Sequence, residues 1–430
     1  MIININNYIF SDNSQEVTKD IIFVSSSQNS KFLDDVQNKP HKNIITDKEL
    51  KKYFDFSSIK IVGITGTNGK TTTAGAIYSF LLDLGYKVAL QGTRGFFIND
   101  EKIKDYTLTT PTQLENFANI SQAIENGCEF FIMEVSSHAI VQKRIEGLDF
   151  ALKIHTNITR DHLDYHKTLE EYIKVKNSFF SDNSSKLINK DDKNVKYHIN
   201  KGCFSYGLDN NATYKVQAFT FKDGFSTVAL QHFGKLYHFT SSLVGTFNVY
   251  NLTSAVAATH ILTHNSLDEI CEVVDHFAGI AGRMEVVWDN PFIVVDFAHT
   301  PNGMEEVFKS FLDRDIIVVF GAGGNRDIEK RKFMGQIANE YAKYIIVTSD
   351  NPRFEDPDKI INDIVQGIYD TKKLQIEINR AKAIEKSIEI ANKCQKSVIL
   401  ILGKGDEEYQ IIYDKKVPFN DKAVVNKLLG

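Results

Sequence analysis

The first segment whose residue types could do chemistry is 66–73, which reads Gly-Thr-Asn-Gly-Lys-Thr-Thr-Thr. An apolar run precedes it and a helix-forming run follows it, as a phosphate-binding loop requires. Small residues let backbone N–H groups turn onto phosphate oxygens, Lys70 can reach the β- and γ-phosphates, and the Thr71 hydroxyl can hold Mg²⁺. Ile64 stands where the strict pattern has a glycine, so a glycine turn beside an incidental lysine is the alternative. We predict an ATP site at Gly66, Thr67, Asn68, Gly69, Lys70, Thr71 and Thr72.

Two further groups could take part in the same chemistry. Glu134 ends an apolar run at 128–135, and a carboxylate at a strand end can hold Mg²⁺. A surface or helix-capping glutamate is the alternative. His162 and His166 are four residues apart and could share one helix face. Taken alone, such a pair is more often structural than metal-binding.

The composition limits the classes of function. The 430 residues carry 50 basic and 55 acidic side chains, a net charge of −5, which argues against a protein that mainly coats nucleic acid or anionic lipid. The first ten residues lack the pattern of a secretory signal, and no apolar run reaches the roughly 18–20 residues of a membrane span. The four cysteines form no CxxC pair, so we expect reduced thiols in a cytoplasmic protein.

The elements that must position these residues fall into three parts, as about 150 residues per domain suggests. We expect a short N-terminal domain at 1–58, a central ATP-binding domain at 59–281 and a C-terminal domain at 282–430. In the centre the pattern predicts strands at 59–66, 87–90 and 128–135, helices at 70–84 and 248–262, and an antiparallel excursion at 203–245.

The C-terminal third shows the clearest alternation. Predicted strands at 316–320, 344–348, 374–378 and 397–402 alternate with predicted helices at 332–342, 358–369 and 381–393. Such alternation is typical of parallel strands joined by crossover helices. We therefore predict an α/β chain whose last domain is Rossmann-like.

Five more motifs follow the loop in order: 134–138 (Glu-Val-Ser-Ser-His), 156–166 (Thr-Asn-Ile-Thr-Arg-Asp-His-Leu-Asp-Tyr-His), 245–251 (Gly-Thr-Phe-Asn-Val-Tyr-Asn), 282–285 (Gly-Arg-Met-Glu) and 296–301 (Asp-Phe-Ala-His-Thr-Pro). Together they resemble the Mur ligases, the cytoplasmic amino-acid-adding enzymes of peptidoglycan synthesis, from about residue 59 to the C-terminus. The motifs at 108–111, 350–353 and 403–405 are similar to the branch that adds the third residue of the stem peptide.

The resemblance implies a three-domain architecture with a P-loop central domain and ATP-dependent amide formation. The γ-phosphoryl group passes to a carboxylate, an amine attacks the acyl phosphate, and phosphate leaves. Lys70, His162 and Lys176 would be catalytic, and Mg²⁺ would be held by Thr71, Glu134, His162 and a carbamylated Lys176. By itself Lys176 is one of several neighbouring lysines, expected to be solvated; only the resemblance singles it out.

The resemblance also implies binding residues. For ATP they are Asn248, Asn251, Arg283 and Asp296, although Asn248 could instead be a helix cap. For the UDP-sugar dipeptide they are Ser14, Thr109, Thr110, Ser136 and Arg144. Hydroxyl donors with an arginine suit a ligand that carries carboxylate and pyrophosphate. The segment 11–15 lacks the arginine of the longer relatives' Asp-Ser-Arg signature, so Ser14 is the least supported of these.

The motif at 350–353, Asp-Asn-Pro-Arg, bears on which amino acid is added. Meso-diaminopimelate has one carboxylate more than L-lysine, and a bidentate arginine would recognise it. The expected contacts are Arg326, Asp350, Asn351, Pro352, Arg353, Gly403 and Glu407. Arg353 could also be an ordinary loop arginine. Asp406 departs from the histidine that relatives often have there.

We therefore predict a cytoplasmic ligase that uses ATP and Mg²⁺ to add meso-diaminopimelate to UDP-N-acetylmuramoyl-L-alanyl-D-glutamate. Its expected partners are these small molecules, with no nucleic acid and no membrane span, and we expect a monomer. The alternatives are addition of L-lysine, a protein that binds ATP without ligating, and a simple phosphohydrolase. Folylpolyglutamate synthase shares the loop, but the Thr-Thr-Pro at 109–111 and the motif at 350–353 fit it poorly.

Overall fold

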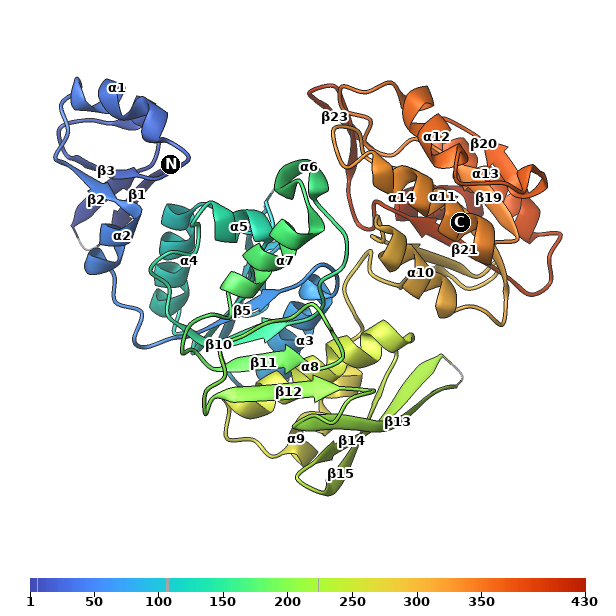
Figure 1. The fold of residues 1–430 in the computed structure, drawn as a ribbon, viewed down its shortest axis with the longest axis horizontal. Helices are drawn as coiled ribbons and strands as arrows, with labels where there is room; N and C mark the ends of the chain where they lie inside the picture. Colours follow the sequence, from blue (N-terminus) through green and yellow to red (C-terminus); the bar gives the residue numbers. More distant parts are fainter. Residues whose placement is uncertain (6, 106–107, 223) are drawn as a thin grey trace.

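The computed structural model describes residues 1–5, 7–105, 108–222 and 224–430. Their strands form sheets of four, eleven, six and two strands, and the three larger sheets follow one another along the chain (Figure 1). We name the parts that hold them the N-terminal unit (1–58), the central unit (59–281) and the C-terminal unit (282–430). These limits are the predicted boundaries and stay predictions.

The N-terminal unit is a small sheet of order β1-β2-β3-β4. Its strands are β1 (Ile2–Ile5), β2 (Tyr8–Ser11), β3 (Ile21–Ser25) and β4 (Asn43–Thr46), and its short helices are α1 (Leu33–Gln37) and α2 (Asp47–Leu50). Phe54 follows this sheet and packs edge-on against Phe117 of the central unit, with ring centres 5.1 Å apart. One apolar cluster thus spans both units.

The central unit is built on the sheet β15-β14-β13-β12-β11-β10-β5-β9-β6-β7-β8. The strands are β5 (Lys60–Thr65), β6 (Val88–Gly92), β7 (Gly95–Ile98), β8 (Glu101–Lys104), β9 (Phe130–Glu134), β10 (Phe150–His155), β11 (Lys186–Asn189), β12 (Cys203–Gly207), β13 (Tyr214–Lys222), β14 (Phe225–His232) and β15 (Lys235–Ser241). The antiparallel prediction for 203–245 holds for β13–β15. It is wrong for β12, which continues the parallel order between β11 and β13.

Helices cover both faces of this sheet (Figure 1). They are α3 (Lys70–Asp83), α4 (Gln113–Glu125), α5 (Ser137–Val141), α6 (Leu163–His166), α7 (Leu169–Ser178), α8 (Thr246–Leu262) and α9 (Leu267–Glu272). Successive residues of β5 point to opposite faces, so Ile61 joins the core under α4 while Val62 joins the core under α3 and α8. Both faces are therefore buried, as the continuous apolar runs of the parallel strands require.

The C-terminal unit has the sheet order β16-β17-β21-β18-β19-β20, parallel except for β16 with β17. The strands are β16 (Glu285–Trp288), β17 (Ile293–Asp296), β18 (Asp315–Phe320), β19 (Tyr344–Val347), β20 (Leu374–Ile376) and β21 (Ser397–Leu402), followed by the hairpin β22 (Tyr409–Ile412) and β23 (Lys415–Pro418). The helices are α10 (Pro301–Lys309), α11 (Glu329–Tyr341), α12 (Pro357–Val365), α13 (Arg380–Ala391) and α14 (Asp421–Leu429). This arrangement confirms the predicted Rossmann-like layer.

Within the described part of the chain, we find no helix with the length and apolarity needed to cross a bilayer.

Candidate active site

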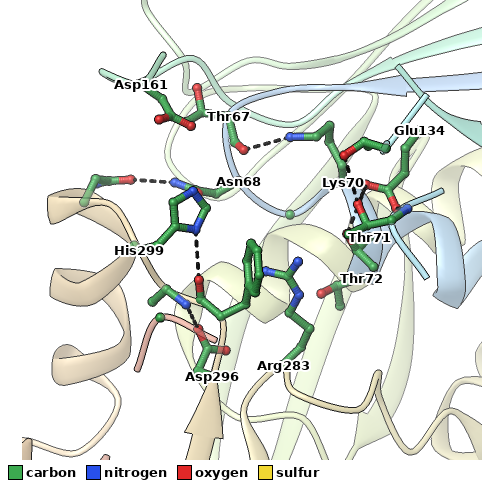
Figure 2. A pocket seen from close by; sticks show the side chains of 18 of the residues that line it. Thr67, Asn68, Lys70, Thr71, Thr72, Glu134, Asp161, Arg283, Asp296 and His299 are labelled. Atoms are coloured by element: carbon green, nitrogen blue, oxygen red, sulfur yellow. Dashed lines mark hydrogen bonds between the residues drawn. The ribbon is translucent and has the colours of Figure 1, made fainter. Parts of the chain in front are cut away.

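A cleft of about 1220 Å³ lies between the central and C-terminal units, and Figure 2 shows part of its lining. The C-terminal ends of β5, β9 and β10 lie on one side of the cleft. Those of β17, β18, β19 and β21 lie on the other side. Ligands bind at the carboxyl ends of parallel strands in open α/β sheets. The two sheets therefore place two such edges around one cavity.

The phosphate loop is held in shape by the segment after β10. The Thr67 N–H donates to the Asn157 carbonyl (2.6 Å), and the Asn68 N–H donates to Asn157 Oδ1 (3.0 Å). Thr156 Oγ1 donates to the Asn68 carbonyl at 2.6 Å. A Cβ on Gly66 would lie 1.8 Å from that hydroxyl, so only glycine fits there. Sequence reasoning placed Thr156 and Asn157 in a motif but gave them no role.

Gly69 and Lys70 begin α3. Gly69 has φ +85°, and an added Cβ would lie 2.3 Å from Asn251 Oδ1, so the loop and α8 approach as closely as glycine allows. The Lys70 ammonium donates to the carbonyls of Gly66 (2.7 Å) and Thr67 (2.9 Å). Burial lowers the pKa of Lys70, while the negative charges of Glu134 and Asp161 oppose that shift. A negatively charged ligand would favour the protonated ammonium further.

Thr71, in the first turn of α3, contacts Glu134 at the end of β9 (Figure 2). Thr71 Oγ1 donates to Glu134 Oε2 at 3.0 Å, and the Thr93 N–H donates to Glu134 Oε1 at 2.9 Å. Within the described residues no group of three or more His, Cys, Asp and Glu side chains could hold a metal. A hydroxyl and a buried carboxylate are hard oxygen donors that fit Mg²⁺ when nucleotide phosphates supply further ligands.

His162 lies at the mouth of the cleft with φ +54°, just before α6. Its Nε2 is 3.4 Å from Asp161 Oδ2, and burial lowers its pKa, so the imidazole is neutral. The His138 and His162 rings are 5.0 Å apart. His166 instead points inward, with Nε2 2.9 Å from Ser137 Oγ. The two histidines therefore do not act as one ligand pair.

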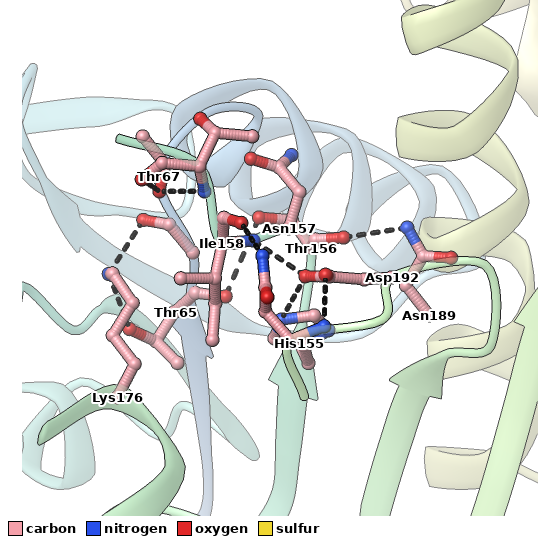
Figure 3. Close-up of polar contacts among 12 residues, drawn as sticks. Thr65, Thr67, His155, Thr156, Asn157, Ile158, Lys176, Asn189 and Asp192 are labelled. Carbon is pink, nitrogen blue, oxygen red and sulfur yellow. Dashed lines mark hydrogen bonds and ion pairs between the residues drawn. The ribbon is translucent and has the colours of Figure 1, made fainter. Parts of the chain in front are cut away.

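Lys176 is buried rather than solvated, which overturns the expectation from its residue type alone. Its ammonium donates to the Gly66 carbonyl (2.9 Å) and lies 3.5 Å from Thr65 Oγ1, as Figure 3 shows. Its Nζ also lies 5.0 Å from the ring centre of Tyr172. Burial and the nearby charge of Lys70 lower its pKa well below the usual range. The amine therefore supports the start of the phosphate loop from behind.

The four residues expected at the nucleotide line the cleft, but three of them also make hydrogen bonds within the protein. Asn248 Nδ2 donates to the Val244 carbonyl at 2.9 Å, and Asn251 Nδ2 donates to Asn248 Oδ1 at 3.3 Å. Asp296 accepts the N–H groups of Met284 (2.7 Å) and Ala298 (2.6 Å), one on each oxygen. These two hydrogen bonds to its carboxylate stabilise the turn after β17. Burial raises the pKa of Asp296.

Arg283 is the fourth, and its guanidinium stacks over the Phe297 ring with 4.2 Å to the ring centre (Figure 2). Because the Phe297 ring covers one face of the guanidinium plane, the N–H groups at the edge of that plane stay available to a ligand in the cleft.

Of the residues expected to bind the sugar dipeptide, three are joined. Thr110 Oγ1 donates to Ser136 Oγ (3.3 Å), and Arg144 Nη1 donates to the Thr110 carbonyl (2.7 Å). Thr109 lines the cleft, where its hydroxyl accepts from Thr93 at 3.2 Å, whereas Thr110, Ser136 and Arg144 are not among the lining residues. Ser14 is buried in the N-terminal unit, and its carbonyl accepts from Lys39. The structure does not bring Ser14 to the others.

The remaining candidates gather on the C-terminal wall. Arg353 Nη1 donates to the Gly324 carbonyl at 2.9 Å, and burial together with repulsion from Arg326 lowers the pKa of Arg353. Two guanidinium groups therefore share one corner of the cleft. Asn351 Nδ2 donates to Glu407 Oε2 (2.8 Å). Arg326, Asp350, Asn351, Arg353, Gly403 and Glu407 all line the cavity, whereas Pro352 packs behind them against Gly324.

Lys404 is a residue of this wall that sequence reasoning left without a role. Its fully buried ammonium donates to Glu407 Oε2 (2.6 Å), the Tyr409 carbonyl (2.7 Å) and Asn351 Oδ1 (3.3 Å). It therefore ties the loop after β21 to the loop after β19. The only sign of this role in the sequence is the position of Lys404 between two glycines, because glycine permits a close approach of backbone segments.

Two family models match the chain. The Mur ligase middle domain matches residues 64–259, and the Mur ligase glutamate ligase domain matches residues 282–405. A protein from Wolinella succinogenes named UDP-N-acetylmuramoyl-L-alanyl-D-glutamate--2,6-diaminopimelate ligase is 49% identical over 98% of this chain and 96% of its own. A protein of the same name from Helicobacter pylori is 50% identical over 96% of this chain and 94% of its own.

Solved structures agree in fold. The structure of a protein with that same name is 30% identical and covers 98% of this chain and 94% of its own, with a TM-score of 0.68. A folylpolyglutamate synthase from Mycobacterium tuberculosis reaches a TM-score of 0.66 at 15% identity, over 81% of this chain and 89% of its own, which is a likeness of fold alone. The two matching models, the relatives and the phosphate loop facing a Rossmann-like layer lead to one conclusion: this chain belongs to the Mur ligase family.

Proposed function

We propose that this ATP-dependent ligase adds meso-diaminopimelate to UDP-N-acetylmuramoyl-L-alanyl-D-glutamate during peptidoglycan precursor synthesis. One observation carries the proposal: a single cleft holds a phosphate loop on one wall and two neighbouring arginines, Arg326 and Arg353, on the other. The names of the relatives, which align over nearly the whole chain, support the same substrates.

The loop side of the cleft would activate the acceptor carboxylate. Backbone N–H groups of the loop and the Lys70 ammonium bind the ATP phosphates, and the N-terminus of α3 adds its dipole. Thr71 and Glu134 would hold Mg²⁺, which neutralises developing charge on the phosphates. Arg283 reaches the nucleotide from the C-terminal unit, so the two units must stay together for transfer.

Lys176 and His162 have supporting roles in this proposal. Burial lowers the pKa of the Lys176 amine and so favours its neutral form, which can add to CO₂ with loss of a proton to give a carbamate, an oxygen ligand for a second Mg²⁺. The neutral imidazole of His162 suits metal binding as well. Tyr172 lies near both, with its ring centre 6.4 Å from that of His162 and 5.0 Å from Lys176 Nζ.

The C-terminal wall would select the incoming amine. Arg326 and Arg353 present two cations to a carboxylate, and Glu407 presents an anion to an ammonium. A site that desolvates two guanidinium groups for a carboxylate rejects a substrate that lacks one, because the cations would stay unpaired. Meso-diaminopimelate is therefore favoured over L-lysine.

The acceptor would reach the loop past Thr110, Ser136 and Arg144, with its uridine end toward the N-terminal unit. Because its nucleotide substrates are cytoplasmic, we place the enzyme in the cytoplasm. We also propose that it acts as a monomer.

The test is ATP hydrolysis coupled to product formation, with purified protein, the UDP-muramoyl dipeptide and either meso-diaminopimelate or L-lysine. We expect a tripeptide of the correct mass only with meso-diaminopimelate, and loss of turnover when Mg²⁺ is chelated. Turnover with L-lysine at equal efficiency would contradict the assigned role of the two arginines. Phosphate release without either co-substrate would contradict ligation.

A further inference from the structure

Lys330 is a buried cation in the wall of the cleft to which neither the sequence motifs nor the reaction described above gives a role. It lies in the first turn of α11, lines the cavity and exposes only 8% of its surface. Among the residues that the structure describes, its ammonium has neither a hydrogen-bond nor an ion-pair partner. The ammonium faces the cavity without a partner from the protein, so an anion that enters the cleft can pair with it.

Lys330 does not make the contacts that attach α11 to the central unit. Neighbouring residues of the helix and of the segment before it make those contacts. Arg160 pairs with Glu329, and its Nε lies 3.7 Å from Asp327 Oδ2. The same guanidinium lies over the Phe333 ring at 5.4 Å. These contacts fix the first turn of the helix beside the 159–162 segment and leave the Lys330 side chain directed into the cavity.

The surroundings place Lys330 opposite the phosphate loop. Lys330 lines the same cleft as Lys70, Asp161 and His299. The charges of Lys330 and Lys70 both interact with that of Asp161, although the two lysines belong to different units. That carboxylate is already engaged, since Asp161 Oδ1 accepts the His162 N–H at 2.9 Å. Two lysines, one from each unit, thus flank the phosphate end of the cleft.

We propose that Lys330 is a catalytic residue whose ammonium contacts the γ-phosphoryl group while it passes from ATP to the acceptor carboxylate. In that step the carboxylate oxygen forms a bond to the γ-phosphorus, and the bond to the bridging oxygen breaks with its electron pair leaving on ADP. Charge spreads over the three equatorial oxygens, where a fixed cation is most effective. The inference rests on the proposed ligase function.

The test isolates this first half of the reaction. Hydroxylamine replaces the amino acid, so that the acyl phosphate is captured as a hydroxamate, and ADP and hydroxamate are measured together in a single turnover. Lys330→Met is compared with the wild type and with Lys332→Met, which removes an exposed lysine of the same helix. ATP affinity is measured by calorimetry, and Lys330→Gln provides a second variant if the methionine protein folds poorly.

We expect hydroxamate formation by Lys330→Met to fall about 100-fold, the size of effect seen when one transition-state donor is removed. ATP affinity should change less than threefold, the Lys332→Met rate should equal that of the wild type, and methylammonium should partly restore Lys330→Ala. A Lys330 variant that forms hydroxamate at the wild-type rate, or one that only raises the KM for the amine, would overturn the inference. Wild-type protein that forms no hydroxamate would instead refute the proposed function itself.

Discussion

Arg94 and Asp406 form an ion pair across the cleft, with 3.0 Å between Nη1 and Oδ2. Arg94 lies in the turn between β6 and β7 of the central unit, and Asp406 follows β21 of the C-terminal unit. The same guanidinium donates to the Ala281 carbonyl at 2.9 Å, next to the predicted boundary. The aspartate at position 406, which departs from the expected histidine, thus gives Arg94 an anionic partner from the other unit.

Reversing one charge of this pair should open the cleft without unfolding the protein. Both side chains are about one-third exposed, so we expect Arg94→Asp to change the free energy of unfolding by less than about 1 kcal/mol. The kcat/KM for ATP should fall several-fold, because closure completes the site. Steady-state kinetics and small-angle scattering measure the two effects. The double reversal Arg94→Asp with Asp406→Arg should recover most of the activity; equal activities of the single and double variants would show that the pair does not control closure.

Gly69→Ala should damage the phosphate loop. Its positive φ costs an alanine about 1–2 kcal/mol, and the new methyl group would press on Asn251 Oδ1. We expect a lower free energy of unfolding in urea and a KM for ATP raised at least tenfold. Gly85→Ala, whose φ is also positive but whose Cβ would meet open space, is the matched control. It should lose similar stability and keep its KM; a similar rise in KM for both variants would argue against the contact with Asn251.

Lys176 predicts an unusual pH dependence of stability. The unfolded chain keeps this amine protonated up to about its ordinary pKa of 10.5, whereas burial lowers the pKa in the folded state. The unfolded state therefore binds more protons, and the free energy of unfolding rises with pH across that window, by at most about 1.4 kcal/mol per pH unit. Lys176→Met should consequently be more stable than the wild type at pH 7 in CO₂-free buffer, and inactive as a ligase.

The stability advantage of Lys176→Met over the wild type should shrink as the pH rises toward the ordinary lysine pKa of 10.5. Urea titrations at several pH values measure it, and Lys174→Met, an exposed neighbour, corrects for general effects of pH. A pH-independent difference would mean that the Lys176 amine stays protonated in the fold, and full ligase activity of Lys176→Met would remove it from the mechanism.

Arg353 should decide between amino acids. Removing one partner of a buried charge pair costs about 2–5 kcal/mol, so Arg353→Gln should lose at least 30-fold in kcat/KM for meso-diaminopimelate. The KM for ATP should stay constant because Arg353 lies on the opposite wall from the loop. The selectivity against L-lysine should fall by a similar factor, as competition assays measure. Arg314→Gln, an arginine stacked on Phe292 away from the cleft lining, is the control. Retained discrimination in Arg353→Gln would place the carboxylate elsewhere.

The sequence predicted those parts of the fold that depend on local pattern. The strand–loop–helix around Lys70 and the alternation after residue 315 were identified because apolar period and turn chemistry agree there. The parallel pairing of β12 was missed, because alternation along a strand is the same for either direction of its neighbour.

The sequence named many of the residues that line the cleft, but not their environment. The end of an apolar run indicated Glu134, and only the family resemblance indicated Lys176. The packing then shows that Lys176 is buried against the Gly66 carbonyl. Thr156 and Lys404 act through backbone carbonyls of other segments, contacts that no local pattern encodes. The sequence likewise contained no sign of Lys330, which is one of several charged residues at the start of its helix. Only the three-dimensional structure shows that it lines the cleft between the two units.

The most direct test of the ligase assignment is ATP-dependent phosphate release with the UDP-muramoyl dipeptide, measured with meso-diaminopimelate, with L-lysine and with no amine. We predict turnover with meso-diaminopimelate alone, with one tripeptide formed for each phosphate released. Phosphate release that is independent of both the dipeptide and the amine would contradict the account.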